Sequence, residues 1–254
     1  MQLKKIYDLI DKCAPFSLSE EYCSRYGAYD NSGILVDCGE DVTGILFSLD
    51  CSLASVREAE RVGADLLVTH HPAIYAPVRS LQGEDAVLAA ARRGISVISA
   101  HLNLDCAGEG IDEMLMEGLG GSEPVLMHPL SAGGYGRAFR LCIGVGELAA
   151  RIRSTFSTDK VLVYGRERPL SRVASFCGAG LDEAALAFAA EQGADALVTS
   201  DGKHHLIAAA VERGMNLFLL PHYAAENYGF YHFYQKIKWE LGVPCEFYTD
   251  GRLL

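Results

Sequence analysis

An internal repeat constrains this chain more than any other feature of its sequence. Residues 63–69 read Gly-Ala-Asp-Leu-Leu-Val-Thr, and residues 193–199 read Gly-Ala-Asp-Ala-Leu-Val-Thr, an offset of 130 residues. Further along, Arg93-Gly94 parallels Arg213-Gly214, and a histidine follows each of these glycines within eight residues. We therefore interpret the chain as two related halves that join at residues 131–136. Chance similarity between short strand–helix units is the alternative.

The local pattern within each half alternates between strand-like and helix-like segments. The predicted buried strands of the first half are residues 34–36, 45–49, 65–69 and 95–99, and its predicted helices are residues 53–62 and 85–93. The same alternation returns after residue 138. Such alternation is typical of mainly parallel sheets covered by helices. The prediction is an α/β fold of two pseudo-repeated βαβαβ lobes, residues 1–130 and 131–254, with a terminal helix that can pack back on the first.

Composition excludes several classes of protein. The chain has 22 basic and 33 acidic residues, a net charge of −11, which argues against a nucleic-acid partner. The longest apolar run, residues 184–190, is far shorter than the roughly 18–20 residues that a membrane span needs. The eight cysteines form no Cys-x-x-Cys motif, and Asp8 interrupts any signal-peptide pattern. We expect reduced thiols, a cytoplasmic location and no membrane partner.

Histidines and carboxylates cluster just after the predicted strands. His70-His71 follows the strand at 65–69, and His-Leu-Asn-Leu-Asp follows the next strand at 101–105. His222 and Glu226 stand four apart at the start of a predicted helix, so they share one face. Ligands of open α/β sheets collect at the carboxyl ends of strands. Hydrogen-bonded loop histidines, a capping loop at 101–105 and a solvated helix at 222–226 are the alternatives.

Together these residues predict a dinuclear metal centre. The expected ligands are His70, His71, Asp105, His222 and Glu226. Mixed imidazole and carboxylate ligation suits zinc, iron or manganese, and a pair of such ions would activate water. Strand-like alternation predicts that His101, Asn103 and Asp105 face one side, which makes His101 the predicted catalytic acid or base.

The motifs resemble those of the NIF-three-like family, whose members are also called GTP cyclohydrolase I type 2 homologues or dinuclear-metal hexameric proteins. The matching segments are residues 29–36, 63–72, 100–105 and 222–226, in the same order. The resemblance implies the same five metal ligands, with His101 as a further site histidine. It also implies two interlinked lobes with the metal pair in a cleft between them, and a homo-oligomer of six chains.

The sequence departs from the family pattern in places that bear on substrate contacts. Tyr29 replaces the usual tryptophan of Trp-Asp-Asn, and Cys177 replaces the first glycine of Gly-Gly-Ala-Gly. The predicted substrate-binding residues are Arg137, Lys203 and His205, which can face an anion. A flexible junction around Arg137 and a solvated helix start at Lys203 and His205 are the alternatives. The aromatic segment 228–241 is expected to form core or subunit interface.

The sequence therefore predicts a dinuclear-metal-dependent hydrolase acting on a small nucleotide-like or phosphorylated substrate through metal-activated water. The alternative is a non-catalytic, oligomeric protein that binds metal or a partner. No guanine-reading motif is visible, so the resemblance alone points to GTP ring opening.

Overall fold

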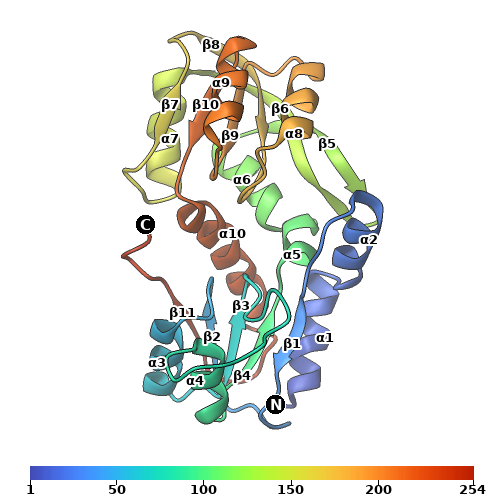
Figure 1. The fold of residues 1–254 in the computed structure, drawn as a ribbon, viewed down its shortest axis with the longest axis vertical. Coiled ribbons are helices and arrows are strands. Elements are labelled where there is room, and N and C mark those ends of the chain that lie inside the picture. Colours follow the sequence, from blue (N-terminus) through green and yellow to red (C-terminus); the bar gives the residue numbers. More distant parts are fainter. The chain divides into compact units, whose positions relative to one another are not determined.

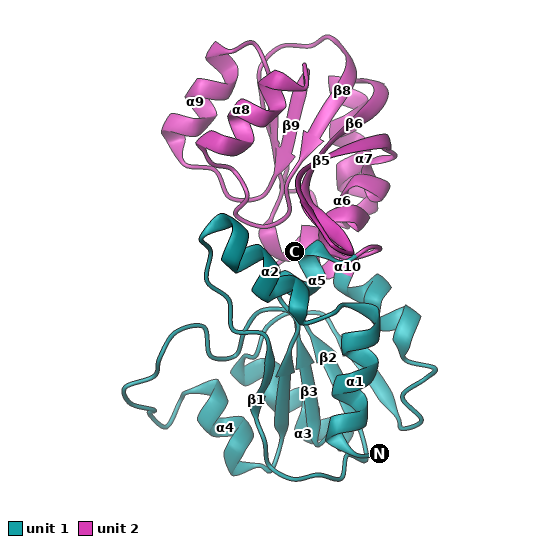
Figure 2. Ribbon diagram, turned by 90° about the vertical axis from the view of Figure 1, so that its right-hand side faces the viewer, with its two compact units in different colours: residues 1–107, 230–250 teal, residues 108–229, 251–254 magenta.

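A computed structural model describes residues 1–254, which form two compact units (Figures 1 and 2). Unit 1 comprises residues 1–107 and 230–250, and unit 2 comprises residues 108–229 and 251–254. The chain leaves unit 1 after residue 107, returns to it at residue 230 and leaves it again after residue 250, so the two units are interlinked in sequence. The predicted boundary at 130/131 differs from the observed one because it falls at the turn of an antiparallel hairpin inside unit 2. None of the helices is both long and apolar enough to cross a lipid bilayer.

Unit 1 is built on a five-stranded sheet in the order β1-β4-β3-β2-β11. Its strands are β1 (Gly33–Val36), β2 (Ile45–Ser48), β3 (Leu66–Thr69), β4 (Ser96–Ser99) and β11 (Cys245–Tyr248). Its helices are α1 (Leu3–Cys13), α2 (Ser17–Tyr26), α3 (Leu53–Val62), α4 (Ala86–Arg92) and α5 (Leu102–Cys106). All strands are parallel except β1, an antiparallel edge strand that is only partly buried, contrary to the fully buried strand expected there.

Both faces of this sheet are covered. Helices α3 and α4 pack on one face through Val56, Ala59 and Ala90 against Leu67 and its neighbours. On the sheet, the Phe47 ring contacts the rings of Phe230 and Tyr234 at centroid distances of 6.0 and 5.1 Å. These two aromatics belong to the second half of α10 (His222–Ile237), so part of the predicted aromatic segment is core.

Unit 2 is built on a six-stranded sheet in the order β5-β6-β8-β9-β10-β7. Its strands are β5 (Ser122–Leu130), β6 (Gly133–Gly144), β7 (Leu162–Tyr164), β8 (Pro169–Ser175), β9 (Ala196–Thr199) and β10 (Asn216–Leu219). Its helices are α6 (Ile111–Leu119), α7 (Val145–Thr155), α8 (Glu183–Glu191), α9 (His204–Glu212) and the first half of α10. Only β8, β9 and β10 are parallel.

The expectation of a mainly parallel second sheet is therefore wrong. Strands β5 and β6 pair antiparallel because residues 131–132 turn the chain back between them, and residues 133–136 already belong to β6. Strand β6 also pairs antiparallel with β8, and β7 with β10. The predicted junction between halves at 131–136 is corrected accordingly. The hairpin adds two strands to unit 2 ahead of its repeated core.

The repeated core itself is confirmed. The order β2–α3–β3–α4–β4 in unit 1 matches β8–α8–β9–α9–β10 in unit 2, and each gives three adjacent parallel strands. The repeated aspartate has the same task in both units. Asp65 accepts hydrogen bonds from the backbone of Thr43 and Gly44, and Asp195 accepts them from Ser171 and Arg172. Asp65 thereby ties the start of β3 to the segment that leads into β2, and Asp195 ties the start of β9 to β8.

Candidate metal centre

Two histidines leave the carboxyl end of β3. His70 is fully buried, and its Nδ1 lies 2.8 Å from the carbonyl oxygen of Ala100. A carbonyl can only accept a hydrogen bond, so Nδ1 carries the proton and Nε2 presents its lone pair. That Nε2 lies 3.4 Å from Oδ1 of Asp105. A lone pair that faces a carboxylate in a buried place is a site for a proton or a metal ion.

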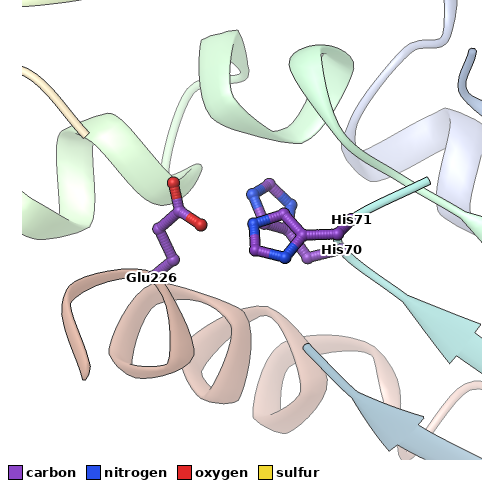
Figure 3. Close-up of side chains that lie close together, drawn as sticks. All are labelled: His70, His71 and Glu226. Carbon is purple, nitrogen blue, oxygen red and sulfur yellow. The ribbon is translucent and has the colours of Figure 1, made fainter. Parts of the chain in front are cut away.

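His71 is oriented in the same manner by a carboxylate. Its Nδ1 lies 2.6 Å from Oδ1 of Asp50, which follows the end of the neighbouring strand β2. The His70 and His71 rings are tilted by 42° at a centroid distance of 5.0 Å, and Figure 3 shows both beside the end of β3. Because Asp50 holds Nδ1, Nε2 is the ligand atom that His71 can offer.

His101 and Asp105 lie on one face of the short helix α5. His101 is the cap residue directly before the helix and Asp105 is its fourth residue, and the Asp105 N–H donates to the His101 carbonyl at 2.8 Å, so a helical turn brings them together, not the strand-like alternation we expected. The expectation that Asn103 shares their side is wrong, because its amide turns away and donates to the carbonyl of Ala14 at 2.7 Å. Ligand atoms of His70, His101 and Asp105 all lie within 4.8 Å of one another. Unit 1 alone therefore contains a group able to hold a metal ion.

The motif at residues 30–32 holds one member of this group, His101, in place through hydrogen bonds. Asp30 Oδ1 lies 2.8 Å from His101 Nδ1, and the hydroxyls of Ser19 and Ser32 donate to Asp30 Oδ2. Burial opposes ionisation of Asp30, but these three hydrogen bonds outweigh it and lower its pKa to about 2. Burial likewise opposes charge on His101, yet Asp30 and the nearby Asp105 raise the pKa of His101.

The first turns of α10 carry the candidate ligands of unit 2, and Figure 3 shows Glu226 on this helix. His222 Nε2 lies 2.8 Å from Glu226 Oε2, which confirms the predicted helical pairing. Its Nδ1 lies 2.7 Å from Oδ2 of Asp201, which follows β9. Both ring nitrogens thus face carboxylates, and the arrangement is satisfied by a protonated imidazole or by a metal ion held between Nε2 and Glu226.

The Cys177–Gly178 turn after β8 lies directly against this pair. Gly178 has φ +59°, and a Cβ placed there would lie 2.5 Å from Glu226 Oε1 and 3.3 Å from His222 Nε2. The preceding residue is fixed by Asp112, whose Oδ1 accepts the Cys177 backbone N–H at 3.0 Å. A Cβ at position 178 would therefore force the Glu226 carboxylate to shift and would crowd the His222 ring.

Arg137, a predicted substrate-binding residue, lies in a buried ion-pair cluster. Its side chain is buried, and its guanidinium pairs with the Asp112 carboxylate and, at 3.4 Å, with Glu113. The Gly136 backbone N–H donates to the same Asp112 at 2.9 Å. The guanidinium thereby holds Asp112 in position, and the predicted contact of Arg137 with a substrate stays a prediction.

Lys203 and His205 lie at the start of α9, and both are exposed. Lys203 is the residue immediately before the helix, and no side-chain cap is formed there. Their predicted contact with a substrate stays a prediction.

Sequence reasoning gave no role to three carboxylates, Asp30, Asp50 and Asp201, each of which holds a site histidine by Nδ1. All three lie within a few residues of a strand terminus, and this position is the sequence signal by which they could have been found. Ligating histidines almost always donate their other ring nitrogen to a carboxylate or carbonyl. A search for acidic residues at the ends of neighbouring strands would have found Asp50 and Asp201.

These observations define a class: an α/β protein with two repeated βαβαβ units whose strand ends carry imidazole and carboxylate groups able to bind metal. The chain belongs to the Duf34/NIF3 (NGG1p interacting factor 3) family, whose model matches residues 1–250. The resemblance noted from the motifs is thereby confirmed.

Individual relatives agree with this assignment. A protein of Clostridium perfringens named GTP cyclohydrolase 1 type 2 homolog is 28% identical over 258 residues, covering 97% of this chain and 95% of that protein. The crystal structure of a Staphylococcus aureus hypothetical protein matches with a TM-score of 0.84 at 26% identity, covering 98% of this chain and 97% of the other. Reduced HcgD from Methanocaldococcus jannaschii matches with a TM-score of 0.83 at 26% identity, covering 97% of each chain.

Proposed function

We propose that the protein is a dinuclear-metal-dependent hydrolase, with His70, His71, Asp105, His222 and Glu226 as its metal ligands. The observation that carries the proposal is which ring nitrogen of each histidine is already hydrogen-bonded. The Nδ1 atoms of His70, His71 and His222 are each held by an oxygen, which leaves each Nε2 as the ligand atom. Two divalent ions, zinc, iron or manganese, would supply Lewis acidity and an activated water.

In this proposal His101 transfers a proton. Asp30 fixes the tautomer and orientation of His101 and stabilises its charged form, as a carboxylate does for a catalytic imidazole. The Asp30 carboxylate stays ionised throughout the physiological pH range, so His101 can return to the charged state after each transfer. Asp30 is a positioning residue, since it acts through His101.

Two tyrosines favour a substrate with a flat ring. Tyr29 and Tyr75 are 56% and 53% exposed, and their rings meet edge to face at 5.7 Å. Tyr75 also lies 6.3 Å from the His101 ring. Exposed aromatic faces beside a reactive group stack well on a nucleobase. Together with the name of the curated relatives, this supports a nucleotide-like substrate, and GTP is the first to test. Lys203 and His205 are the proposed contacts for its anionic part.

The alternative is a non-catalytic protein that binds metal or a partner and works as an oligomer. The Trp239 ring favours it, because it is 82% exposed and lies 4.8 Å from the Lys238 ammonium, so it offers an apolar surface for docking. A homo-oligomer, with six chains as the first expectation, is compatible with either function.

The test is hydrolysis of nucleotides and phosphoesters by the metal-reconstituted chain and by its His101→Ala and His205→Ala variants. His204→Ala is the matched control, since His204 is an exposed neighbour with no proposed role. We expect turnover to fall by a factor of about 10²–10⁴ in His101→Ala, the usual contribution of acid–base catalysis. Unchanged turnover in that variant removes His101 from the mechanism. No turnover of any substrate by the metal-loaded chain favours the alternative.

A further inference from the structure

We propose that Cys177 supplies a thiolate ligand, so that unit 2 by itself presents a Cys-His-Glu metal site with His222 and Glu226. The inference rests on the proposed metal function and deepens it.

The position of the thiol carries the proposal. Cys177 is 3% exposed, and its Sγ lies within 4.8 Å of a Glu226 carboxylate oxygen. The next residue, Gly178, lies close to both His222 and Glu226, since a Cβ built there would be 2.5 Å from Glu226 Oε1 and 3.3 Å from His222 Nε2. The turn therefore places the Cys177 thiol beside Glu226, whose carboxylate in turn lies 2.8 Å from His222 Nε2.

The backbone of this turn is held independently of the thiol. The Cys177 N–H donates to Asp112 Oδ1 at 3.0 Å, and the Tyr135 hydroxyl donates to the Cys177 carbonyl at 2.8 Å. Arg137 in turn holds Asp112. With its backbone fixed at both ends of the residue, Cys177 meets a metal ion in a preorganised position.

The three donor types predict a preference among metals. Thiolate, imidazole and carboxylate together suit zinc, iron(II) and cobalt(II), whereas manganese and magnesium favour oxygen ligands. The thiol loses its proton when it binds the metal, and the proton leaves to solvent. Unit 2 is therefore expected to prefer zinc or iron over manganese.

Cobalt(II) titration of the full chain under reducing conditions tests the inference, because sulfur ligation adds a near-ultraviolet charge-transfer band to the visible cobalt bands. Cys177→Gly and Cys177→Ser remove the thiol in two ways, and Cys142→Ser is the control, since Cys142 is an exposed cysteine of β6. We expect the charge-transfer band in the native chain and in Cys142→Ser, and its loss in both Cys177 variants. Zinc affinity should fall in these variants by at least about tenfold, with little change for manganese.

The outcomes separate this inference from the proposed function. Visible cobalt bands without a charge-transfer band in the native chain overturn the thiolate and leave the metal centre intact. A charge-transfer band that survives in both Cys177 variants assigns it to another cysteine and also overturns the inference. No cobalt bands in any chain contradict the metal centre itself, and with it the proposed function.

Discussion

The ends of β3 and β9 occupy the same position in the repeat but carry different chemistry. The chain reads Thr69-His70-His71 after β3 and Thr199-Ser200-Asp201 after β9. In unit 1 the central strand supplies the imidazole, and the carboxylate Asp50 comes from the neighbouring strand. In unit 2 the central strand supplies the carboxylate Asp201, and the imidazole His222 comes from the helix after the next strand.

The two contacts are otherwise alike. The distance from Nδ1 to the carboxylate oxygen is 2.6 Å in unit 1 and 2.7 Å in unit 2. A repeated scaffold therefore fixes where reactive groups collect, while the residue types at each strand end remain interchangeable. Both units therefore contain an imidazole–carboxylate contact. The central strand supplies the imidazole in unit 1 and the carboxylate in unit 2.

The largest effect is expected from converting the β3 end into the β9 sequence. The double substitution His70→Ser with His71→Asp removes two imidazoles, takes the His70 ring away from Asp105 and puts a new carboxylate on the residue that contacts Asp50. We expect metal affinity to fall by at least about 100-fold, more than the loss of an outer-shell partner causes. Metal titration against a chelating dye measures it. Ser200→Ala is the control at the equivalent position of unit 2, and equal affinity in the double variant would show that unit 1 binds no metal.

The next largest effect on metal affinity is expected from neutralising either of the two supporting carboxylates, Asp50 and Asp201. Asp50→Asn and Asp201→Asn keep the side-chain shape but remove the charge that orients His71 and His222. Each is expected to weaken metal binding by roughly 10–100-fold. The same titration compares them directly. A loss in one variant with native affinity in the other would break the equivalence of the two contacts.

A smaller effect on metal affinity is expected from alanine at one of two glycines that have a left-handed backbone. Gly63→Ala and Gly178→Ala both introduce Cβ strain, at φ +72° and +59°, of about 1–2 kcal/mol. Only the second places a methyl group against Glu226 and His222. We expect thermal unfolding to shift similarly in both variants, while metal affinity falls only in Gly178→Ala. Native affinity in Gly178→Ala would show that the turn does not constrain the ligands.

The smallest effect concerns the repeated aspartate. Burial opposes ionisation of Asp65, but hydrogen bonds from Thr43 and Gly44 lower its pKa below its unfolded value of about 3.9. The folded-state pKa is the lower one, so this stabilisation is present above about pH 4 and is lost as the pH falls through the folded value. Asp65→Asn should cost about 1 kcal/mol at pH 7 and less at pH 3, by urea unfolding. A cost independent of pH would contradict the assignment.

The repeated core could be predicted from the sequence because its signals are local. Helix α3 has its predicted bounds, since Gly63 ends it in the left-handed conformation, and the buried strands β2 to β4 follow apolar runs. The β5–β6 hairpin was missed because Gly133, Gly134 and Gly136 read as a linker. In the structure, Gly134 is required by the close approach of the His128 carbonyl, a contact across the hairpin.

The site residues likewise divide into those that a local sequence signal reveals and those that it does not. His222 and Glu226 were found because four-residue spacing on a helix is visible in sequence. The placement of Asn103 was wrong because residues 102–106 form a helix in place of an extended strand end. The roles of Asp30 and Arg137 depend on partners 71 and 25 residues away, and no local pattern reveals such partners.

Metal content per chain tests the central claim most directly. The full chain would be purified without chelators or a histidine tag, reconstituted in turn with zinc, iron(II) and manganese, and measured by elemental analysis. We predict about two ions per chain, since the proposed ligands provide for two divalent ions. Zero or one ion per chain with every metal would contradict the dinuclear centre.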